Sequence, residues 1–314
     1  MNFSQLKKTN IKISAIGFGT NAVGGHNLFT NIDEEQGKKM IEEAMSAGVT
    51  FFDTADAYGF GRSEEILGET IRHKRSELVI ATKGGIEKLN DGSTRINNSP
   101  EYMRKAVEDS LKRLKTDYLD LYYLHFPDPT VPLSESIGEL SRLKEEGKIR
   151  AIGVSNVTLE QLKMANYDND ISAVQCPYNM LDRSVEKDLL PYCIQNEISY
   201  IPYGPLAFGI LGGKYTKDFV LDREDWRNDI SLFKPEIYQE NLLKIEKLKE
   251  VALEKDTSLS NLALSWLLAQ EGVDAVIPGG KRPEQVRQNT AASNVKLNKD
   301  DLMKIEGILE AVKM

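Results

Sequence analysis

Four residues of the types that carry acid–base chemistry follow three short apolar runs of the chain: Asp53, Tyr58, Lys83 and His125. A tyrosine, whose ordinary pKa is about 10, donates a proton reluctantly unless its anion is stabilised. A nearby lysine would lower the tyrosine's pKa, and a carboxylate paired with that lysine would hold the ammonium in place. A histidine would add a hydrogen bond to a substrate oxygen or to the phenol. The group suits protonation of an oxygen that gains charge as hydride adds to its carbon, which is a carbonyl reduction.

Each of the four residues also fits a structural role when it is taken alone. A tyrosine after a strand is often a packing residue, a strand-end lysine or aspartate is often solvated, and Asp56 is as polar a neighbour as Asp53. Strand interiors do not need such groups, and burying them unpaired is costly. Because all four lie at the ends of three consecutive predicted strands, we expect them to act together.

Eight predicted strands alternate with predicted helices along the chain. The strands are expected at residues 15–19, 49–52, 78–82, 119–124, 149–154, 173–176, 198–203 and 275–277. The helices are expected at residues 33–47, 62–73, 100–114, 132–146, from 158, at 185–196, from 235 with a break near 257–258, from 283, and at 297–312. Residues 3–14 predict a hairpin before this series. The alternation predicts a single (β/α)8 TIM barrel over residues 1–314, with an N-terminal β-hairpin and an extra C-terminal helix.

A doubly wound open sheet is the alternative architecture. It is disfavoured because the segment after the first strand reads GFGTNA at residues 17–22 and carries no Gly-x-Gly-x-x-Gly. In a barrel the active site lies at the C-terminal ends of the strands, which is where the four residues fall.

Composition restricts the class of protein further. The 314 residues are 40% hydrophobic and 28% charged, as in an ordinary globular protein. The net charge of -8 disfavours nucleic acid and anionic membranes as partners. Two cysteines, no apolar signal segment and no membrane-length run predict a cytoplasmic protein. A metal-dependent hydrolase is poorly supported, since the three histidines lie on different segments, and we expect no metal.

Five motifs extend the pattern over nearly the whole chain: GVTFFDTA at residues 48–55 leading to Tyr58, DYLDL at 117–121 leading to His125, GKIRAIGVSN at 147–156, GGKY at 212–215 and IPGG at 277–280. With them the chain resembles the aldo-keto reductase superfamily, and within it the bacterial enzymes related to the inositol-operon reductase of bacilli. The resemblance implies a catalytic tetrad of the four residues, with Tyr58 as general acid and NADP(H) as hydride source. The substrate would be a small carbonyl or alcohol, reduced or oxidised reversibly. The alternative is a cofactor-binding regulatory or redox-sensor subunit that turns over slowly, and the oligomeric state stays open.

The resemblance also assigns cofactor contacts. Those expected near the nicotinamide are Ser155, Asn156, Gln175 and Tyr203, the last followed by Gly204, Pro205 and Leu206. Further cofactor contacts are expected from Gly19, Thr20, Asn21 and Asp53. A clasp over the pyrophosphate is expected from Gly209, Leu211, Gly213 and Lys214. The segment expected at the adenosine end comprises Gly279, Gly280, Lys281, Arg282, Gln285, Gln288 and Asn289. Because Gln285 stands where the family often has arginine, Lys281 and Arg282 would grip the 2′-phosphate. The loop after the seventh strand has few apolar residues before Trp226, so we expect it to be mobile without cofactor. The alternative is a permanently docked loop that Phe219, Trp226 and Phe233 hold against the barrel top.

Overall fold

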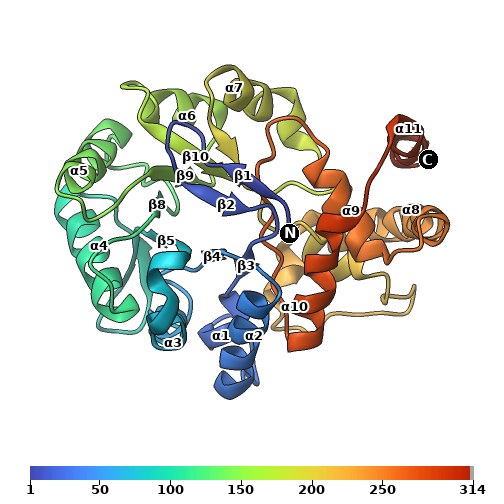
Figure 1. The fold of residues 1–314 in the computed structure, drawn as a ribbon, viewed down its shortest axis with the longest axis horizontal. Coiled ribbons are helices and arrows are strands. Elements are labelled where there is room, and N and C mark those ends of the chain that lie inside the picture. The colour runs from blue at the N-terminus through green and yellow to red at the C-terminus, as the bar shows by residue number, and fades with distance from the viewer. Residues whose placement is uncertain (312–314) are drawn as a thin grey trace.

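Short buried strands lie side by side in the computed structural model of the protein, which describes residues 1–311. Within those residues a seven-stranded sheet has the order β11–β10–β9–β8–β5–β4–β3, and each neighbouring pair is parallel. The strands are β3 (Phe18–Gly19), β4 (Phe51–Asp53), β5 (Val79–Gly84), β8 (Leu121–Leu124), β9 (Ile152–Ser155), β10 (Ile171–Gln175) and β11 (Ser199–Tyr200). The sheet curls into a ring with helices around it (Figure 1).

The expected eighth strand at residues 275–277 closes the ring without forming a regular strand. Tyr200 donates its N–H to Gly272 O at 3.0 Å, and Val276 donates its N–H to Ala15 O at 2.9 Å. Only the isolated bridges Tyr200–Val273 and Ile16–Val276 result. The segment is short because it runs between Gly272, which has a φ of +86°, and Pro278, which has no N–H to donate. The ring is a (β/α)8 barrel, which excludes the doubly wound sheet.

Helices cover the outside of the ring, and several of them begin after a residue whose side chain caps the helix. Asp33 accepts hydrogen bonds from the N–H groups of Glu35 and Gln36, and Thr158 forms a capping box with Gln161. The helices are α1 (Asn21–Gly24), α2 (Glu34–Ser46), α3 (Arg62–Ile71), α4 (Pro100–Leu114), α5 (Leu133–Glu145), α6 (Leu159–Ala165), α7 (Leu189–Gln195), α8 (Pro235–Glu254), α9 (Leu259–Leu268), α10 (Pro283–Thr290) and α11 (Lys299–Glu310).

Several elements differ from the sequence prediction. The helix expected at 185–196 is split into a 3-10 turn (Ser184–Lys187) and α7, because Asp188 leaves the helical region at φ -148°. The helix expected to reach residue 73 continues after Ile71 only as a 3-10 turn (Arg72–Glu77). The loop after β5 carries an unpredicted hairpin, β6 (Ile86–Lys88) and β7 (Thr94–Ile96). The predicted end of the last helix, residue 312, lies outside the described residues.

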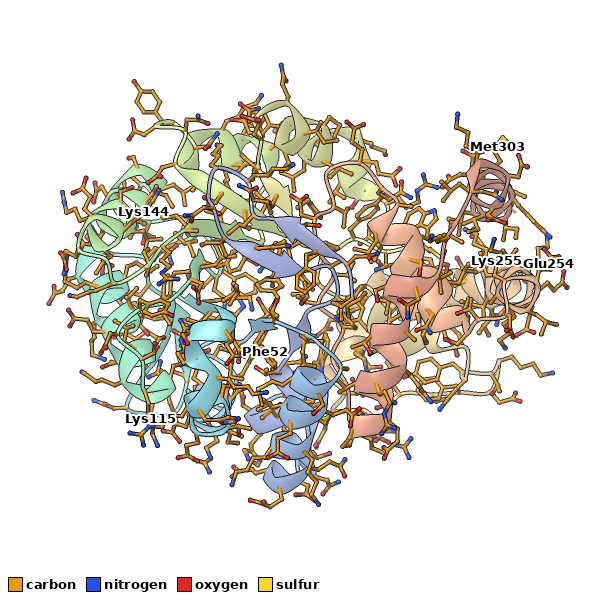
Figure 2. All side chains as sticks on the ribbon, in the orientation of Figure 1. Phe52, Lys115, Lys144, Glu254, Lys255 and Met303 are labelled. Atoms are coloured by element: carbon orange, nitrogen blue, oxygen red, sulfur yellow. The ribbon has the colours of Figure 1, made fainter. Side chains whose placement is uncertain are left out.

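Two apolar layers result from the alternation of side chains along the strands. Phe51 points into the ring with Ala81, Leu121 and Tyr123, while Phe52 packs outward against the helices. Figure 2 shows side chains filling the interior, with Phe52 well inside the outline of the molecule. The barrel is therefore a packed core and not a channel.

The N-terminal hairpin closes one end of the barrel. It is formed by β1 (Phe3–Gln5) and β2 (Lys12–Ser14), and it lies across the ring in Figure 1. Leu6 and Ile13 are fully buried and join the inner apolar layer, and Lys7 N donates to Ser199 Oγ at 2.9 Å. This end carries the strand N-termini, so the opposite end is the one left open to a site.

The last helix, α11, lies at the edge of the molecule against α8. Lys255 and Asp301 form an ion pair of 2.7 Å across the two helices, and Lys304 pairs with Glu254 at 2.6 Å. Lys255, Glu254 and Met303 appear together at this edge in Figure 2. Across the described residues, we find no helix with both the length and the hydropathy that crossing a membrane requires.

Candidate active site

A buried ion pair joins the ends of β4 and β5. Lys83 Nζ lies 2.5 Å from Asp53 Oδ1 and donates to Thr54 O at 2.8 Å, and both charged side chains are nearly inaccessible. Gln175 Nε2 donates to the other carboxylate oxygen, Asp53 Oδ2, at 2.8 Å. Burial is the strongest single influence and lowers the pKa of Lys83, but the interactions with Asp53 and Tyr58 together outweigh it and leave that pKa above its ordinary value. The lysine is therefore a fixed cation, as the sequence analysis expected.

Tyr58 lies beside this cation and opposite His125. The Lys83 ammonium is 5.2 Å from the centre of the Tyr58 ring, and the His125 ring meets the Tyr58 ring edge-on at 6.3 Å. Burial raises the pKa of Tyr58, and the positive charge of Lys83 opposes that rise without cancelling it. The expected net lowering of this pKa is therefore not found. The phenol keeps its proton at neutral pH, which is the state that a proton donor needs.

His125 follows β8 and is buried as a neutral imidazole. Burial, and then the charge of Lys83, hold the pKa of His125 well below its ordinary value. Its Nδ1 finds no hydrogen-bond partner among the described residues. The ring stacks on Phe126 with 4.8 Å between ring centres, and the backbone oxygen accepts from Asn156 Nδ2 at 2.9 Å. A neutral imidazole held in this way can exchange a hydrogen bond with a ligand oxygen but adds no charge.

Buried hydroxyl groups hold the end of β3 against β4 and α3. Thr20 N donates to Asp53 O at 2.9 Å, and Ser63 Oγ donates to Thr20 O at 2.8 Å. Thr54 Oγ1 extends the chain to Ser63 Oγ at 3.3 Å. Thr20, which the sequence placed among the cofactor contacts, is thus fully buried and fixes the backbone of Asp53.

Ser155, Asn156, Gln175 and Tyr203 come together at the ends of the next strands, as predicted. Ser155 Oγ donates to Gln175 O at 2.7 Å, and Tyr203 OH donates to Asn156 Oδ1 at 2.9 Å. Asn156 adopts a left-handed φ of +56°, which asparagine tolerates better than most residues. Together with the bonds of Gln175 to Asp53 and of Asn156 to His125, these contacts make one polar wall beside the ion pair.

The loop between β11 and α8, residues 201–234, is anchored more firmly than the sequence suggested. Tyr215 stacks on Phe219 with 4.0 Å between ring centres, and Phe208 meets Trp226 edge-on at 5.6 Å. Arg227 Nη1 donates to Tyr215 OH at 2.7 Å. The buried residues of this loop are Ile201, Pro202, Pro205, Ala207, Ile210, Leu211 and Leu232. The expectation of few apolar anchors before Trp226 is therefore wrong.

The residues of that loop that were predicted to contact the cofactor, including the clasp, have different surroundings. Gly204, Gly209 and Gly213 have left-handed φ angles of +62°, +107° and +69°. Leu206 is partly buried against the core, whereas Leu211 is fully buried. Lys214 is exposed and lines a surface groove with Lys217 and Lys249 beside α8. The glycines make tight turns with positive φ angles, while Lys214 lies on the side of the loop that faces α8.

The segment from Gly279 to Asn289 turns from the closing strand into α10. Asn289 Nδ2 donates to Gly279 O at 3.1 Å, and Gln285 Oε1 accepts from Lys281 N at 2.8 Å. Lys281, Arg282 and Gln288 are exposed, and in the described part of the chain neither Lys281 nor Arg282 has a carboxylate within 4.0 Å.

The segment also contacts β3, because Gly19 N donates to Pro278 O at 3.2 Å. A Cβ on Gly19 would lie 3.1 Å from Ile277 O, and one on Gly279 would lie 3.2 Å from Asn21 Oδ1. Gly280 would bring a Cβ within 3.1 Å of Val286. Because glycine has no side chain at these positions, the backbone of residues 277–280 can approach the end of β3. This close contact places Gly19 and Asn21 beside the predicted adenosine segment.

Two features of the site were missed by the sequence reasoning. The Thr54 carbonyl is a second acceptor for Lys83, and a backbone group gives no signal in the sequence. Tyr123 lies beneath the ion pair, with Lys83 Nζ 6.0 Å from its ring centre. The inward alternation of β8 could have identified Tyr123. Over residues 1–311, no three His, Cys, Asp or Glu side chains gather as a metal site would require.

The chain is similar to known proteins over nearly its whole length. A sequence model described as the Aldo/keto reductase family matches residues 15–310. The chain is 37% identical to the aldo-keto reductase YhdN of Bacillus subtilis, covering 99% of this chain and 94% of that one. It is 34% identical to the NADH-specific methylglyoxal reductase of Escherichia coli, covering 98% of both. Among solved structures, the glycerol dehydrogenase AKR11B4 of Gluconobacter oxydans superposes with a TM-score of 0.92 at 31% identity, covering 98% of this chain and 95% of that one.

Proposed function

Because this chain belongs to the aldo/keto reductase family, we propose that it reduces aldehydes or ketones reversibly with NADP(H), with Tyr58 as the general acid. Membership of the family makes the protein an oxidoreductase that uses a nicotinamide cofactor. The choice of NADP(H) over NAD(H) and the roles of individual residues are the proposed part. The observation that carries the proposal is the position of Tyr58 beside the buried Lys83–Asp53 ion pair.

Tyr58 would donate its proton to the substrate oxygen as negative charge develops there. The phenol is protonated at neutral pH, and the phenolate left behind would face the Lys83 ammonium, which Asp53 and Thr54 O hold in place. Preorganised positive charge aimed at a developing anion lowers the barrier, and it acts more strongly in a buried site than in water. In the oxidative direction the same pair would accept the alcohol proton.

His125 would orient the substrate oxygen. Its neutral imidazole can donate or accept one hydrogen bond without competing with Tyr58 for the proton. The edge-on contact with the Tyr58 ring would bring both groups to the same face of a bound carbonyl. A charged histidine would instead repel Lys83, so the neutral state suits the site.

The residues that would hold the cofactor fit its chemistry. When bound, NADPH supplies the hydride that reduces the carbonyl carbon. A carboxamide needs both donors and acceptors, and the amides of Asn156 and Gln175 carry both. Gln175 Nε2 already has one N–H on Asp53, and Asn156 Nδ2 bonds His125 O and Ser155 Oγ, so a bound carboxamide would share or replace these hydrogen bonds. The adenosine 2′-phosphate would meet Lys281 and Arg282, which are exposed cations without carboxylate partners in the described residues.

Gln285 reduces that preference for NADP(H), because its Oε1 is engaged by Lys281 N and it carries no charge. The Escherichia coli relative is named as NADH-specific, so both cofactors need to be compared. We expect NADPH to be preferred, because Lys281 and Arg282 would bind its 2′-phosphate.

The test is a panel of carbonyl compounds offered to the purified protein with NADPH and, in parallel, with NADH. Methylglyoxal and glyceraldehyde are included because relatives are named for methylglyoxal reduction and glycerol oxidation. Consumption of NADPH that depends on the carbonyl, and is faster than that of NADH, is expected. Cofactor binding without turnover on any member of the panel would favour a regulatory or redox-sensor subunit instead.

A further inference from the structure

The turn that follows Tyr58 is held in an unfavourable backbone conformation. Gly59, Phe60 and Gly61 are three successive residues with left-handed φ angles of +63°, +53° and +97°. Phe60 carries a side chain, so its conformation costs on the order of 1 kcal/mol. The turn also packs closely on the neighbouring loop, since a Cβ on Gly59 would lie 1.9 Å from Gly24 O. Such strain persists only where the surroundings hold the backbone in place.

The contacts that hold this turn come mainly from outside it. The backbone hydrogen bonds that close residues 55–63 are long, between 3.2 and 3.4 Å. In contrast, Gly59 N donates to Asn27 Oδ1 at 2.7 Å, and Asn27 Nδ2 donates to Ala57 O at 3.1 Å. One amide side chain therefore bonds the residue before Tyr58 and the residue after it.

The loop that carries Asn27, residues 25–33, is itself tied to the same turn. Glu34, the first residue of α2, accepts two hydrogen bonds from Arg62, from Nε at 2.9 Å and from Nη2 at 2.7 Å. His26 Nε2 lies 2.9 Å from Glu34 Oε1. Because Arg62 begins α3 directly after the turn, these contacts keep Asn27 at a fixed distance from it. The Asn27 amide is thus presented to the turn from an anchored loop.

We propose that Asn27 is a positioning residue for catalysis, which sets the place of the Tyr58 hydroxyl by bonding the backbone on both sides of it. The inference rests on the proposed function, in which Tyr58 is the proton donor. Within residues 1–311 the Asn27 side chain has hydrogen bonds to Ala57 and Gly59 and none to Lys83, Asp53 or His125, so it would act through the backbone on either side of Tyr58. An error of about 1 Å in such a group can cost about 10²-fold in rate. Because the Asn27 bonds are exposed to water, we expect a smaller loss, of about ten-fold.

The test compares Asn27→Ala and Asn27→Asp with the wild type. Asn27→Ala removes both bonds and should lower kcat about ten-fold, with an unchanged Kd for NADPH and an unchanged melting temperature. Asn27→Asp keeps the acceptor for Gly59 N–H and loses the donor to Ala57 O, so its kcat should be intermediate. The matched control is Asn10→Ala, an exposed asparagine in the hairpin turn at the opposite end of the barrel, which should keep wild-type kcat.

A second readout is the hydrogen exchange of residues 57–62, which does not depend on turnover. Asn27→Ala should lose protection there, and the primary isotope effect with NADPH deuterated at the transferred position should rise as the chemical step slows. Wild-type kcat and wild-type exchange in Asn27→Ala would overturn the inference, as would a loss of kcat fully explained by weaker NADPH binding. If the wild type shows no turnover, the proposed function fails, whereas the exchange experiment still decides whether Asn27 holds the turn.

Discussion

Replacing Asp53 by asparagine removes the charge that compensates Lys83 while nearly preserving the shape of the side chain. The ammonium lies 2.5 Å from the carboxylate and is 1% exposed, so water cannot take over from the lost partner. Breaking a buried ion pair by removing one partner typically costs 3–5 kcal/mol, because the other charge is left uncompensated. The hydrogen bond from Gln175 is also weakened, since its acceptor loses its charge. We therefore expect Asp53→Asn to lower the free energy of unfolding by about 3–5 kcal/mol at pH 7.

The pH dependence of stability should change sign in the same variant. In the wild type the pKa of Lys83 is higher in the folded than in the unfolded protein, where it is about 10.4. The stability that protonated Lys83 contributes is therefore complete at pH values below about 10.4, and it is lost as the pH rises through the pKa of Lys83 in the folded protein. Without Asp53, burial should lower the pKa of Lys83 below its unfolded value. The unfolded chain then binds more protons than the folded one, so the variant should gain stability relative to the wild type as pH rises from about 7 towards 10.

The measurement is urea unfolding followed by the fluorescence of the buried Trp266, at pH 7 and at pH 9.5. The control is Asp109→Asn, which removes a partly exposed partner of the exposed Lys105 and Lys112 and should cost less than about 1 kcal/mol. A loss in Asp53→Asn no larger than in this control, or a gap to the wild type that widens with pH, would refute the description of Lys83 and Asp53 as a buried charge pair.

Three further outcomes are expected. Lys281→Ala combined with Arg282→Ala should weaken the binding of NADPH far more than that of NADH in fluorescence titration, since each charged contact to a phosphate contributes roughly 1.5–3 kcal/mol. Equal losses of affinity for the two cofactors would place the phosphate site elsewhere. The pKa of His125 is lower in the folded than in the unfolded protein, so below about pH 6.5 the unfolded chain should bind a proton that the folded chain does not, and the free energy of unfolding should fall as the pH falls. Urea titrations across pH 5–7 should show this fall in the wild type and not in His125→Gln. Arg227→Ala should release the loop after β11 and raise its hydrogen exchange, because the bond to Tyr215 OH is lost, and unchanged exchange would show that aromatic packing alone holds the loop.

The barrel could be predicted from the sequence because its elements repeat a strong local pattern. The alternation of apolar runs with helical segments identified the order of the elements, and in the structure Asp33, Ser99 and Thr158 cap three of the helices. The closing strand near Val276 was overestimated, because an apolar run does not reveal how few of its residues find partners. The hairpin β6–β7 was missed for the opposite reason, since its strands are exposed and carry no apolar alternation.

The candidate site was predictable as a set of residue types and less so as a set of interactions. Strand ends in a parallel barrel meet on one face, so placing Asp53, Lys83 and His125 together needed only the strand assignments. The direction of the pKa shift of Tyr58 could not be predicted, because it depends on how burial balances against the charge of Lys83. The contacts of Asn27 with the Tyr58 turn arise between two loops, which no periodicity in the sequence describes.

The loop after β11 shows a similar limit. The sequence does not reveal the stacking of Tyr215 on Phe219, because that contact depends on how the loop folds back on itself. Whether cofactor binding changes this loop stays a prediction, and exchange of residues 209–230 with and without NADP tests it. Added protection on binding would indicate a clasp that closes, and unchanged protection a fixed wall.

The most direct test of the central claim is the turnover of Tyr58→Phe with NADPH and a carbonyl substrate that the wild type reduces. The variant keeps the ring between Lys83 and His125 and loses only the hydroxyl group. If Tyr58 is the general acid, the variant should bind NADPH with wild-type affinity and reduce the carbonyl about 10²-fold or more slowly. Turnover close to that of the wild type, at the same substrate and cofactor concentrations, would contradict the proposed role of Tyr58 and the mechanism built on it.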